Sequence, residues 1–91
     1  MNKSELINAV AEKANLTKRE AEAVVNGVFD SIAEALAKGE KVQVVGFGTF
    51  ETHTRAARPG RNPQNGEQIT IPETRVPAFK AGKALKDLVR S

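Results

Sequence analysis

The feature that most constrains the fold is an interval, residues 51–68, that contains no large apolar side chain. Such a segment cannot line a hydrophobic core. Its two ends are nevertheless typical of strands, because 51–55 is rich in threonine and 68–71 alternates polar and apolar residues. Asn65 and Gly66 between them form a dipeptide typical of tight hairpin turns. The sequence therefore predicts a two-stranded projecting ribbon, with limbs of about a dozen residues that reach roughly 40 Å at ~3.3 Å per residue.

Two helices are predicted before this ribbon from capping boxes, in which an Asn or Thr precedes a Glu by three residues. Asn2 and Glu5 form the first box, and Thr17 and Glu20 form the second. Apolar residues follow each box at helical spacing, and the set after the second box makes a wide apolar stripe. Gly39 then stands where helices commonly end.

After Lys41 the hydrophobic period changes to two, which indicates strands. Three strands are predicted, at 42–44, 49–54 and 69–71, with a tight turn around a buried Phe47 between the first two. A short helix follows, and its expected inward residues are Ala84, Leu85, Leu88 and Val89. The predicted fold class is therefore α+β: two N-terminal helices, a three-stranded antiparallel sheet with a long projecting β-ribbon arm, and a short C-terminal helix.

The length of 91 residues predicts one domain, and a domain of this size is marginally stable alone. The chain has no cysteine and a single histidine, so neither disulfides nor a metal site are expected. Association with a second chain is the expected source of the missing stability. No secretory signal or apolar run of membrane-spanning length is apparent, so we expect a soluble protein of the cytoplasm.

Basic residues concentrate in the second half of the chain. The net charge of +3 divides into −2 for residues 1–40 and +5 for residues 41–91. Arg55, Arg58 and Arg61 lie on the predicted ribbon, and arginine suits phosphates and narrow, negative grooves. A single arginine would fit a solvated strand edge equally well. Three of them, on a segment with nothing to bury, favour binding of a nucleic acid.

Pro63, near the predicted end of the ribbon, allows two interpretations. The simpler one is a turn-forming residue ahead of Asn65 and Gly66. The functional one is an apolar wedge, because proline has a rigid ring and no N–H to desolvate. Minor-groove architectural proteins insert such wedges between base steps and kink the duplex.

The run from Gly46 to Gly66, in which GFGTF is followed by RPGRNPQNG, resembles the signature of the bacterial HU/IHF family of histone-like DNA-binding proteins, closest to its homodimeric HU branch. The N-terminal MNKSELINAVAEKANLTKREAE and the C-terminal VPAFKAGKALKD resemble it as well, so the resemblance covers essentially the whole chain. It implies an intertwined dimer. Residues 1–50 and 76–91 would form the dimer body, and 51–75 a β-arm that curls along the minor groove with Pro63 at a kink.

The resemblance also implies the residues that contact DNA, on the arm, the body and the C-terminal helix. They are Lys3, His53, Arg55, Arg58, Arg61, Asn62, Pro63, Arg75, Lys80, Lys83 and Lys86. Two positions depart from the family's pattern. His53 stands where arginine is common, and a mostly neutral imidazole contributes less to phosphate binding. Pro59 stands where many members have a basic or small polar residue, and it stiffens the arm.

The predicted function is binding and bending of double-stranded DNA, largely without sequence specificity, in the bacterial nucleoid. The protein would act as a homodimer or paired with a second family member. A site-selective, IHF-like bender is one alternative, and a protein-interaction module that uses the ribbon is another. RNA binding is disfavoured because there is no Tyr or Trp and all four Phe are expected in the core. No enzymatic site, cofactor, small-molecule substrate or membrane contact is expected.

Overall fold

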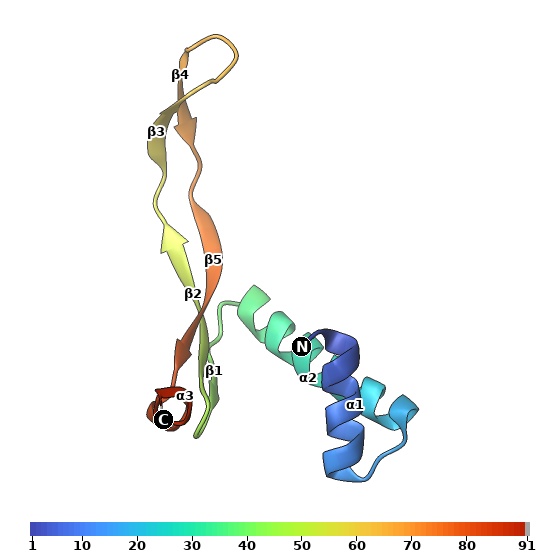
Figure 1. The fold of residues 1–91 in the computed structure, drawn as a ribbon. Coiled ribbons are helices and arrows are strands. Elements are labelled where there is room, and N and C mark those ends of the chain that lie inside the picture. Colours follow the sequence, from blue (N-terminus) through green and yellow to red (C-terminus); the bar gives the residue numbers. More distant parts are fainter. Residues whose placement is uncertain (91) are drawn as a thin grey trace. The chain divides into compact units, whose positions relative to one another are not determined.

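A computed structural model of the protein describes residues Met1 to Arg90, which form three helices and five strands (Figure 1). In chain order these are α1 (Lys3–Ala14), α2 (Lys18–Ala37), β1 (Val42–Val44), β2 (Gly48–Arg55), β3 (Arg58–Arg61), β4 (Gln68–Ile71), β5 (Thr74–Ala81) and α3 (Lys83–Arg90). Helices combined with antiparallel sheets confirm the predicted α+β class. The chain divides into a unit of residues Met1–Ala35 and a second unit that begins at Leu36.

The start of α1 has the predicted Asn2 cap, and the start of α2 has the complete capping box. The Glu5 N–H donates to Asn2 Oδ1 at 2.9 Å. The second box closes in both directions, since the Glu20 N–H donates to Thr17 Oγ1 at 3.1 Å and the Thr17 N–H donates to Glu20 Oε1 at 2.9 Å. The Thr17 backbone bond lowers the pKa of Glu20 below its ordinary value. These local bonds satisfy donors that helix starts leave free, so the sequence alone specifies where the helices begin.

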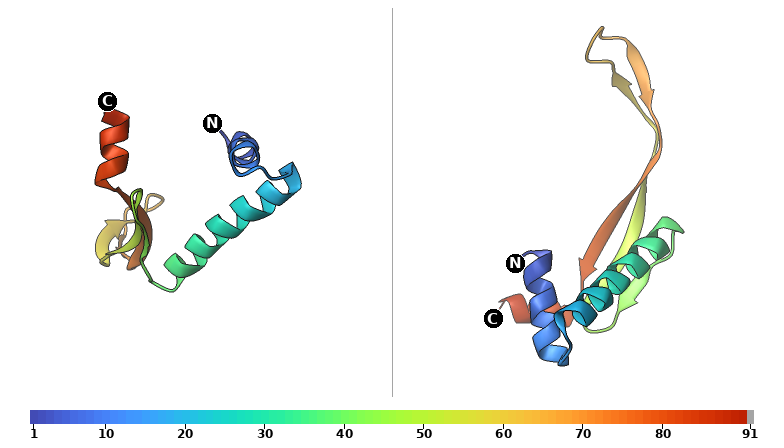
Figure 2. Two further views of the ribbon diagram at one scale, coloured as in Figure 1. Left: turned by 90° about the horizontal axis from the view of Figure 1, so that it is seen from below. Right: turned by 90° about the vertical axis from the view of Figure 1, so that its right-hand side faces the viewer.

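The N-terminal unit buries little apolar surface. α1 lies beside the first part of α2 (Figure 2), and Ala21 and Val25 of α2 are buried. Val24, Val28 and Phe29 belong to the same apolar stripe and are about half exposed. The predicted wide stripe therefore exists, but a single chain covers only part of it.

In the second unit, β2 is the central strand of an antiparallel sheet in the order β1-β2-β5. Phe50 pairs with Phe79 across β2 and β5, and their ring centroids lie 4.8 Å apart. A Cβ at Gly48 would lie 2.5 Å from the Phe79 ring and from the Lys80 carbonyl oxygen. Only glycine permits this close approach, which brings β2 and β5 together at the base of the ribbon.

The third strand of this sheet is β5, whereas the strand predicted at 69–71 is present but lies outside this sheet. Residues 68–71 form β4, which pairs with β3 in the ribbon instead. Pro77 hid the strand in the sequence, because proline cannot donate to a ladder. β5 lies at an edge of the sheet, where a proline is tolerated.

Several side chains expected in the core are exposed in the single chain. Phe47 is 46% exposed, so the expectation of a buried aromatic in the turn is wrong for the chain by itself. Phe29 and Phe79 are also exposed, so the four Phe are not all buried. On α3, Val89 is 77% exposed and the expected inward orientation of Ala84, Leu88 and Val89 is not observed. The physical reason is the same throughout: one chain of this size has too little apolar surface to cover these faces.

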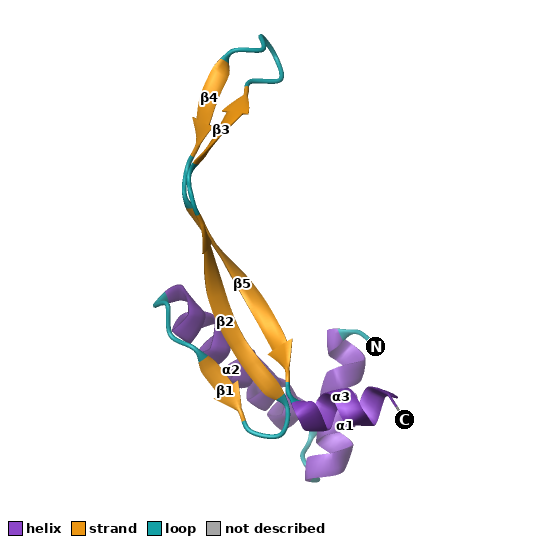
Figure 3. Cartoon of the chain, turned by 90° about the vertical axis from the view of Figure 1, so that its left-hand side faces the viewer, coloured by secondary structure: helices purple, strands orange, loops and turns teal. Residues whose placement is uncertain are grey.

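The predicted ribbon is confirmed. β3 and β4 continue the β2–β5 ladder outward and lie at the far end of the hairpin from β1 and α3 (Figures 1 and 3). Arg55 pairs with Thr74 at the end of the first ladder, and Arg58 pairs with Ile71 at the start of the second. The two ladders share one pairing register, yet residues 56–57 and 72–73 between them are unpaired (teal in Figure 3). Pro72 contributes to the interruption because it has no N–H to donate.

Candidate nucleic-acid interface

The far end of the ribbon is a loop of residues 62–67 that is closed by its own backbone. The Asn62 N–H donates to the Glu67 carbonyl at 2.8 Å, and the Gly66 N–H donates to the Asn62 carbonyl at 2.8 Å. Asn62 Oδ1 also accepts from the Gln64 N–H at 2.9 Å. Asn62 therefore organises the loop with three of its atoms, and it holds the residue that follows it in place.

That following residue is Pro63, which is exposed in the loop just beyond the last ladder pair. Asn65 and Gly66, which the sequence predicts at the turn of the ribbon, lie within this longer loop and do not form a two-residue turn by themselves. Such a turn of type I′ needs positive φ at both residues, and here only Gly66 has one, 72°. The longer loop carries Pro63 and its neighbours past the end of the ladder.

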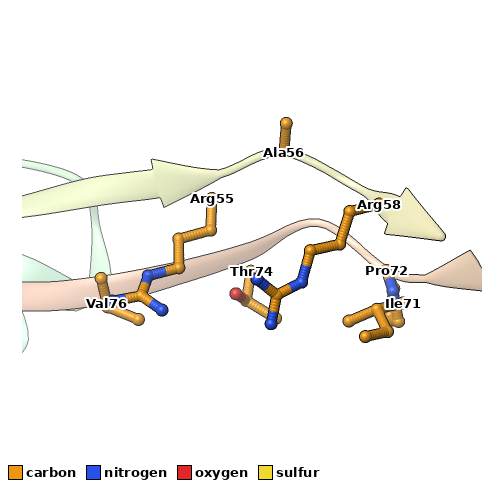
Figure 4. A pocket seen from close by; sticks show the side chains of 7 residues that line it. All are labelled: Arg55, Ala56, Arg58, Ile71, Pro72, Thr74 and Val76. Atoms are coloured by element: carbon orange, nitrogen blue, oxygen red, sulfur yellow. The ribbon is translucent and has the colours of Figure 1, made fainter. Parts of the chain in front are cut away.

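Closer to the body, Arg55 and Arg58 share one hollow of about 510 Å³ at the ladder interruption (Figure 4). Both guanidinium groups extend toward the same side, across the opposite strand. The remaining lining residues are mostly apolar: Ala56, Ile71, Pro72, Thr74 and Val76.

The shared orientation follows from the interruption. Residues three apart on a regular strand point to opposite faces, because side chains alternate with a period of two. The unpaired Ala56 and Ala57 separate Arg55 from Arg58, and the ribbon turns there. Two cationic forks above an apolar floor form a surface suited to a sugar–phosphate backbone.

The arm arginines have no ion-pair partner in the part of the chain that the structure describes. Over the described residues Met1–Arg90, no carboxylate lies within ion-pair distance of Arg55, Arg58 or Arg61. Arg61 is exposed at the end of β3, opposite Gln68. Such cations on an exposed ribbon attract an anionic partner, and no ion pair among the described residues has to break when they bind it.

A buried carboxylate, which the sequence did not predict as part of the site, organises the cations at the base of the ribbon. The Glu51 side chain is only 8% exposed. Its Oε1 lies 3.4 Å from Lys80 Nζ and 3.8 Å from His53 Nε2, and its Oε2 lies 3.7 Å from Lys41 Nζ. Alternation places Glu51 and His53 on one face of β2, which was predictable. Lys80 joins them through the β2–β5 register, which was not.

Opposing effects act on the pKa of Glu51. Burial is the largest single influence and raises it, but Lys80, followed by Lys41 and His53, stabilises the charged form. The combined attraction prevails and holds the pKa of Glu51 below its ordinary value. The carboxylate is therefore charged at neutral pH and partly offsets two of the predicted DNA-contacting residues.

The other predicted contact residues are distributed over three elements. Arg75 of β5 donates from Nη2 to the Ala37 carbonyl at 3.0 Å, at the end of α2. This contact favours a cation because helix C-termini carry partial negative charge. Lys83 and Lys86 are exposed on α3. Lys3 lies on the first turn of α1 in the N-terminal unit, beside a hollow that Lys18 also lines.

Two further kinds of site are absent from the part of the chain that the structure describes. No group of three or more His, Asp or Glu side chains is arranged to hold a metal ion. No helix there is long and apolar enough to cross a bilayer.

A ribbon arm with unpaired arginines, on a small α+β body, defines a class of DNA-binding proteins, and sequence comparison agrees. The chain matches the family of bacterial DNA-binding proteins over residues 1–90, and it belongs to that family. This is a family of DNA-binding proteins and not of enzymes, which confirms the expectation that the chain is not an enzyme.

Within the family the chain is similar to proteins named DNA-binding protein HU. It is 67% identical over 90 residues to that of Staphylococcus aureus (strain COL), covering 99% of this chain and 100% of the relative. It is 64% identical over 90 residues to that of Geobacillus stearothermophilus, with the same coverage. The fold is also similar to that of a solved Anabaena HU–DNA cocrystal structure, with a TM-score of 0.89 and 54% sequence identity. The match covers 98% of this chain and 97% of the Anabaena chain. The resemblance inferred from the sequence is thereby confirmed.

Proposed function

We propose that this protein binds double-stranded DNA largely without sequence specificity, bends it through the minor groove and organises the bacterial nucleoid in the cytoplasm as a homodimer. The observation that carries the proposal is the ribbon. Along its length it presents Arg55, Arg58 and Arg61, which have no ion-pair partner among residues 1–90, and at its end it presents an exposed Pro63. Similarity to an HU protein solved with DNA supports the same conclusion.

The ribbon interacts with DNA in two ways. Arg55 and Arg58 attract phosphates around their shared hollow, and Arg61 does so nearer the loop. These contacts recognise charge and shape, which every DNA sequence offers. Pro63, held beside the hydrogen-bonded Asn62, then inserts between base steps and kinks the duplex.

The body supports the DNA that the arms bend. Lys80 and His53 lie at the base of the ribbon around Glu51, and Lys83 and Lys86 extend the basic surface along α3. Arg75 anchors β5 to the end of α2 and lies beside this surface. Lys3 contacts the flank of longer DNA. Residues 51–75 form the arm, and 1–50 with 76–91 form the body.

Dimerisation is supported by the surface that one chain leaves uncovered. The buried apolar residues among those described are Ala21 and Val25, while Val28, Phe29, Phe47 and Val89 are about half exposed or more. Exposed apolar surface of this extent is typical of an obligate interface. A second copy of the chain supplies the cover and, with it, the second arm.

Binding to duplexes of unrelated sequence, measured across a salt series, tests the proposal. We expect similar affinities for all of them, with a steep loss as salt rises. Deletion of residues 56–66 should preserve the dimer and abolish tight binding, because it removes Arg58, Arg61 and Pro63. A strong preference for one sequence would favour a site-selective bender. A deletion variant that binds DNA normally would refute the role of the arm.

A further inference from the structure

The chain contains two Asn–Gly pairs, Asn65–Gly66 in the ribbon loop and Asn26–Gly27 inside α2. Asparagine followed by glycine is prone to spontaneous deamidation, because glycine has no side chain to shield its backbone nitrogen. The two pairs are equivalent in the sequence, but the structure distinguishes them. We propose that Asn65 is a site of spontaneous modification to aspartate and isoaspartate, whereas Asn26 is protected.

The reaction needs only water. The Gly66 backbone nitrogen attacks Cγ of Asn65, and the bond between Cγ and Nδ2 breaks. The proton lost from the Gly66 nitrogen leaves with Nδ2 as ammonia, and a five-membered succinimide remains. Water then opens the ring at one of its two carbonyls, giving aspartate or isoaspartate.

The conformation of Asn65 favours this attack. Its Oδ1 accepts a hydrogen bond from the Glu67 N–H at 2.9 Å. This Asx turn folds the side-chain amide back along the Gly66 peptide, and the donated hydrogen bond makes Cγ more electrophilic. A Cβ at Gly66 would have no atom within 4 Å, and the same holds at Gly27, so crowding around the glycine does not distinguish the two pairs.

One contact opposes the reaction and sets its rate. The Gly66 N–H donates to the Asn62 carbonyl at 2.8 Å, which occupies the nitrogen that must attack. This bond belongs to an exposed loop beyond the last ladder pair, where local opening costs little free energy. Each opening releases the nitrogen beside a side chain that is already folded toward it.

Asn26 differs from Asn65 in the direction of its side-chain amide and in how firmly the following glycine nitrogen is held. It lies well inside the 20-residue α2, where a helical N–H is bonded to the carbonyl four residues earlier. Helical side chains are directed toward the N-terminus, which carries the Asn26 amide away from the Gly27 nitrogen. Releasing that nitrogen requires unwinding of the helix interior. Asn62 is also inert by this route, because the nitrogen of Pro63 has no proton to lose.

The modification places a carboxylate on the part of the arm that lacks one. Residues 52–66 carry three arginines and no acidic residue. Aspartate can keep the Asx turn, whereas isoaspartate adds a backbone methylene to the loop that presents Pro63. This consequence, unlike the chemistry, rests on the proposed function. We expect modified protein to bind DNA roughly two- to tenfold more weakly at physiological salt.

The test is to age the full-length protein at mildly alkaline pH and physiological temperature, and then to digest it with trypsin. Cleavage after Arg61 and Arg75 isolates Asn65, and cleavage after Arg19 and Lys38 isolates Asn26. Mass spectrometry follows the exchange of NH2 for OH, and an isoaspartate-specific assay identifies the second product. Asn65→Gln and Asn26→Gln are the matched variants, and Asn65→Asp reproduces one product.

We expect Asn65 to deamidate at least about tenfold faster than Asn26 in the folded protein, and at a similar rate to Asn26 after denaturation. Of the two glutamine variants, only Asn65→Gln should remove the signal. Equal rates in the folded protein, or a stable Asn65, would overturn the proposal. If Asn65→Asp binds DNA as tightly as wild type, the predicted effect of deamidation on DNA binding is wrong, but the deamidation of Asn65 is not. If unmodified protein fails to bind DNA, the proposed function is wrong, and the deamidation of Asn65 again stands.

Discussion

Replacing Arg58 with glutamine should lower the salt dependence of DNA binding by a calculable amount. The Arg58 guanidinium lines an open hollow and has no carboxylate partner among the described residues, so its loss should leave folding unchanged. A homodimer carries two copies, so the substitution removes two phosphate contacts. At roughly 0.9 per contact, the slope of log affinity against log salt should become shallower by about 1.8.

The loss of affinity follows from the same structure. If each exposed contact contributes up to about 1 kcal/mol, the dimer loses up to about 2 kcal/mol, or roughly thirtyfold. Fluorescence anisotropy on a random duplex at several salt concentrations measures both quantities. Arg19→Gln is the matched control, because Arg19 is exposed on α2 and outside the proposed interface. A slope that stays at the wild-type value in Arg58→Gln would refute the assignment of Arg58 to phosphate.

Three further substitutions test separate parts of the account. Pro63→Ala should reduce DNA bending, measured by energy transfer between duplex ends, more than it reduces DNA affinity. An unchanged bend would refute the role of Pro63 as a wedge. His53→Arg should raise DNA affinity modestly, because a permanent cation then stands at the base of the ribbon; an unchanged affinity would exclude this position from the interface. Glu51→Gln should flatten the acid dependence of the melting temperature. A carboxylate with a lowered pKa contributes stability above its unfolded pKa, near 4.3 for glutamate, and loses it as the pH falls through the folded value. An acid profile identical to wild type would show that the Glu51 ion pairs contribute nothing.

The sequence predicted the parts of the fold that local interactions decide. The hydrogen bonds of Asn2 and of Thr17 with Glu20 join residues three apart, so their pattern is visible in the chain itself. The ribbon was predictable from what it lacks, because a long segment without large apolar residues has to leave the core.

The parts that it did not predict depend on contacts between distant residues. β5 was missed because Pro77 disguised an edge strand. Glu51 was missed because Lys80 and Lys41 reach it through strand register, which alternation alone does not specify.

Phe47 and α3 were wrongly placed for a related reason. Their apolar residues were assigned to the core of one chain, whereas a single chain leaves Phe47, Phe79 and Val89 exposed. An apolar pattern indicates that a residue becomes buried, but it does not distinguish burial within the chain from burial against a second copy. The same limit applies to the loop, where the Asn65–Gly66 dipeptide indicated a turn but not the length of the loop that contains it.

The most direct test of the central claim is the distance between the two ends of a bound duplex. Energy transfer between fluorophores at those ends should report a marked shortening when wild-type protein binds, larger on nicked DNA, where a kink costs less. The variant lacking residues 56–66 should produce no shortening at any concentration at which it remains a dimer. If wild-type protein saturates the duplex while the distance between its ends stays that of free DNA, the protein does not bend DNA and the account is wrong.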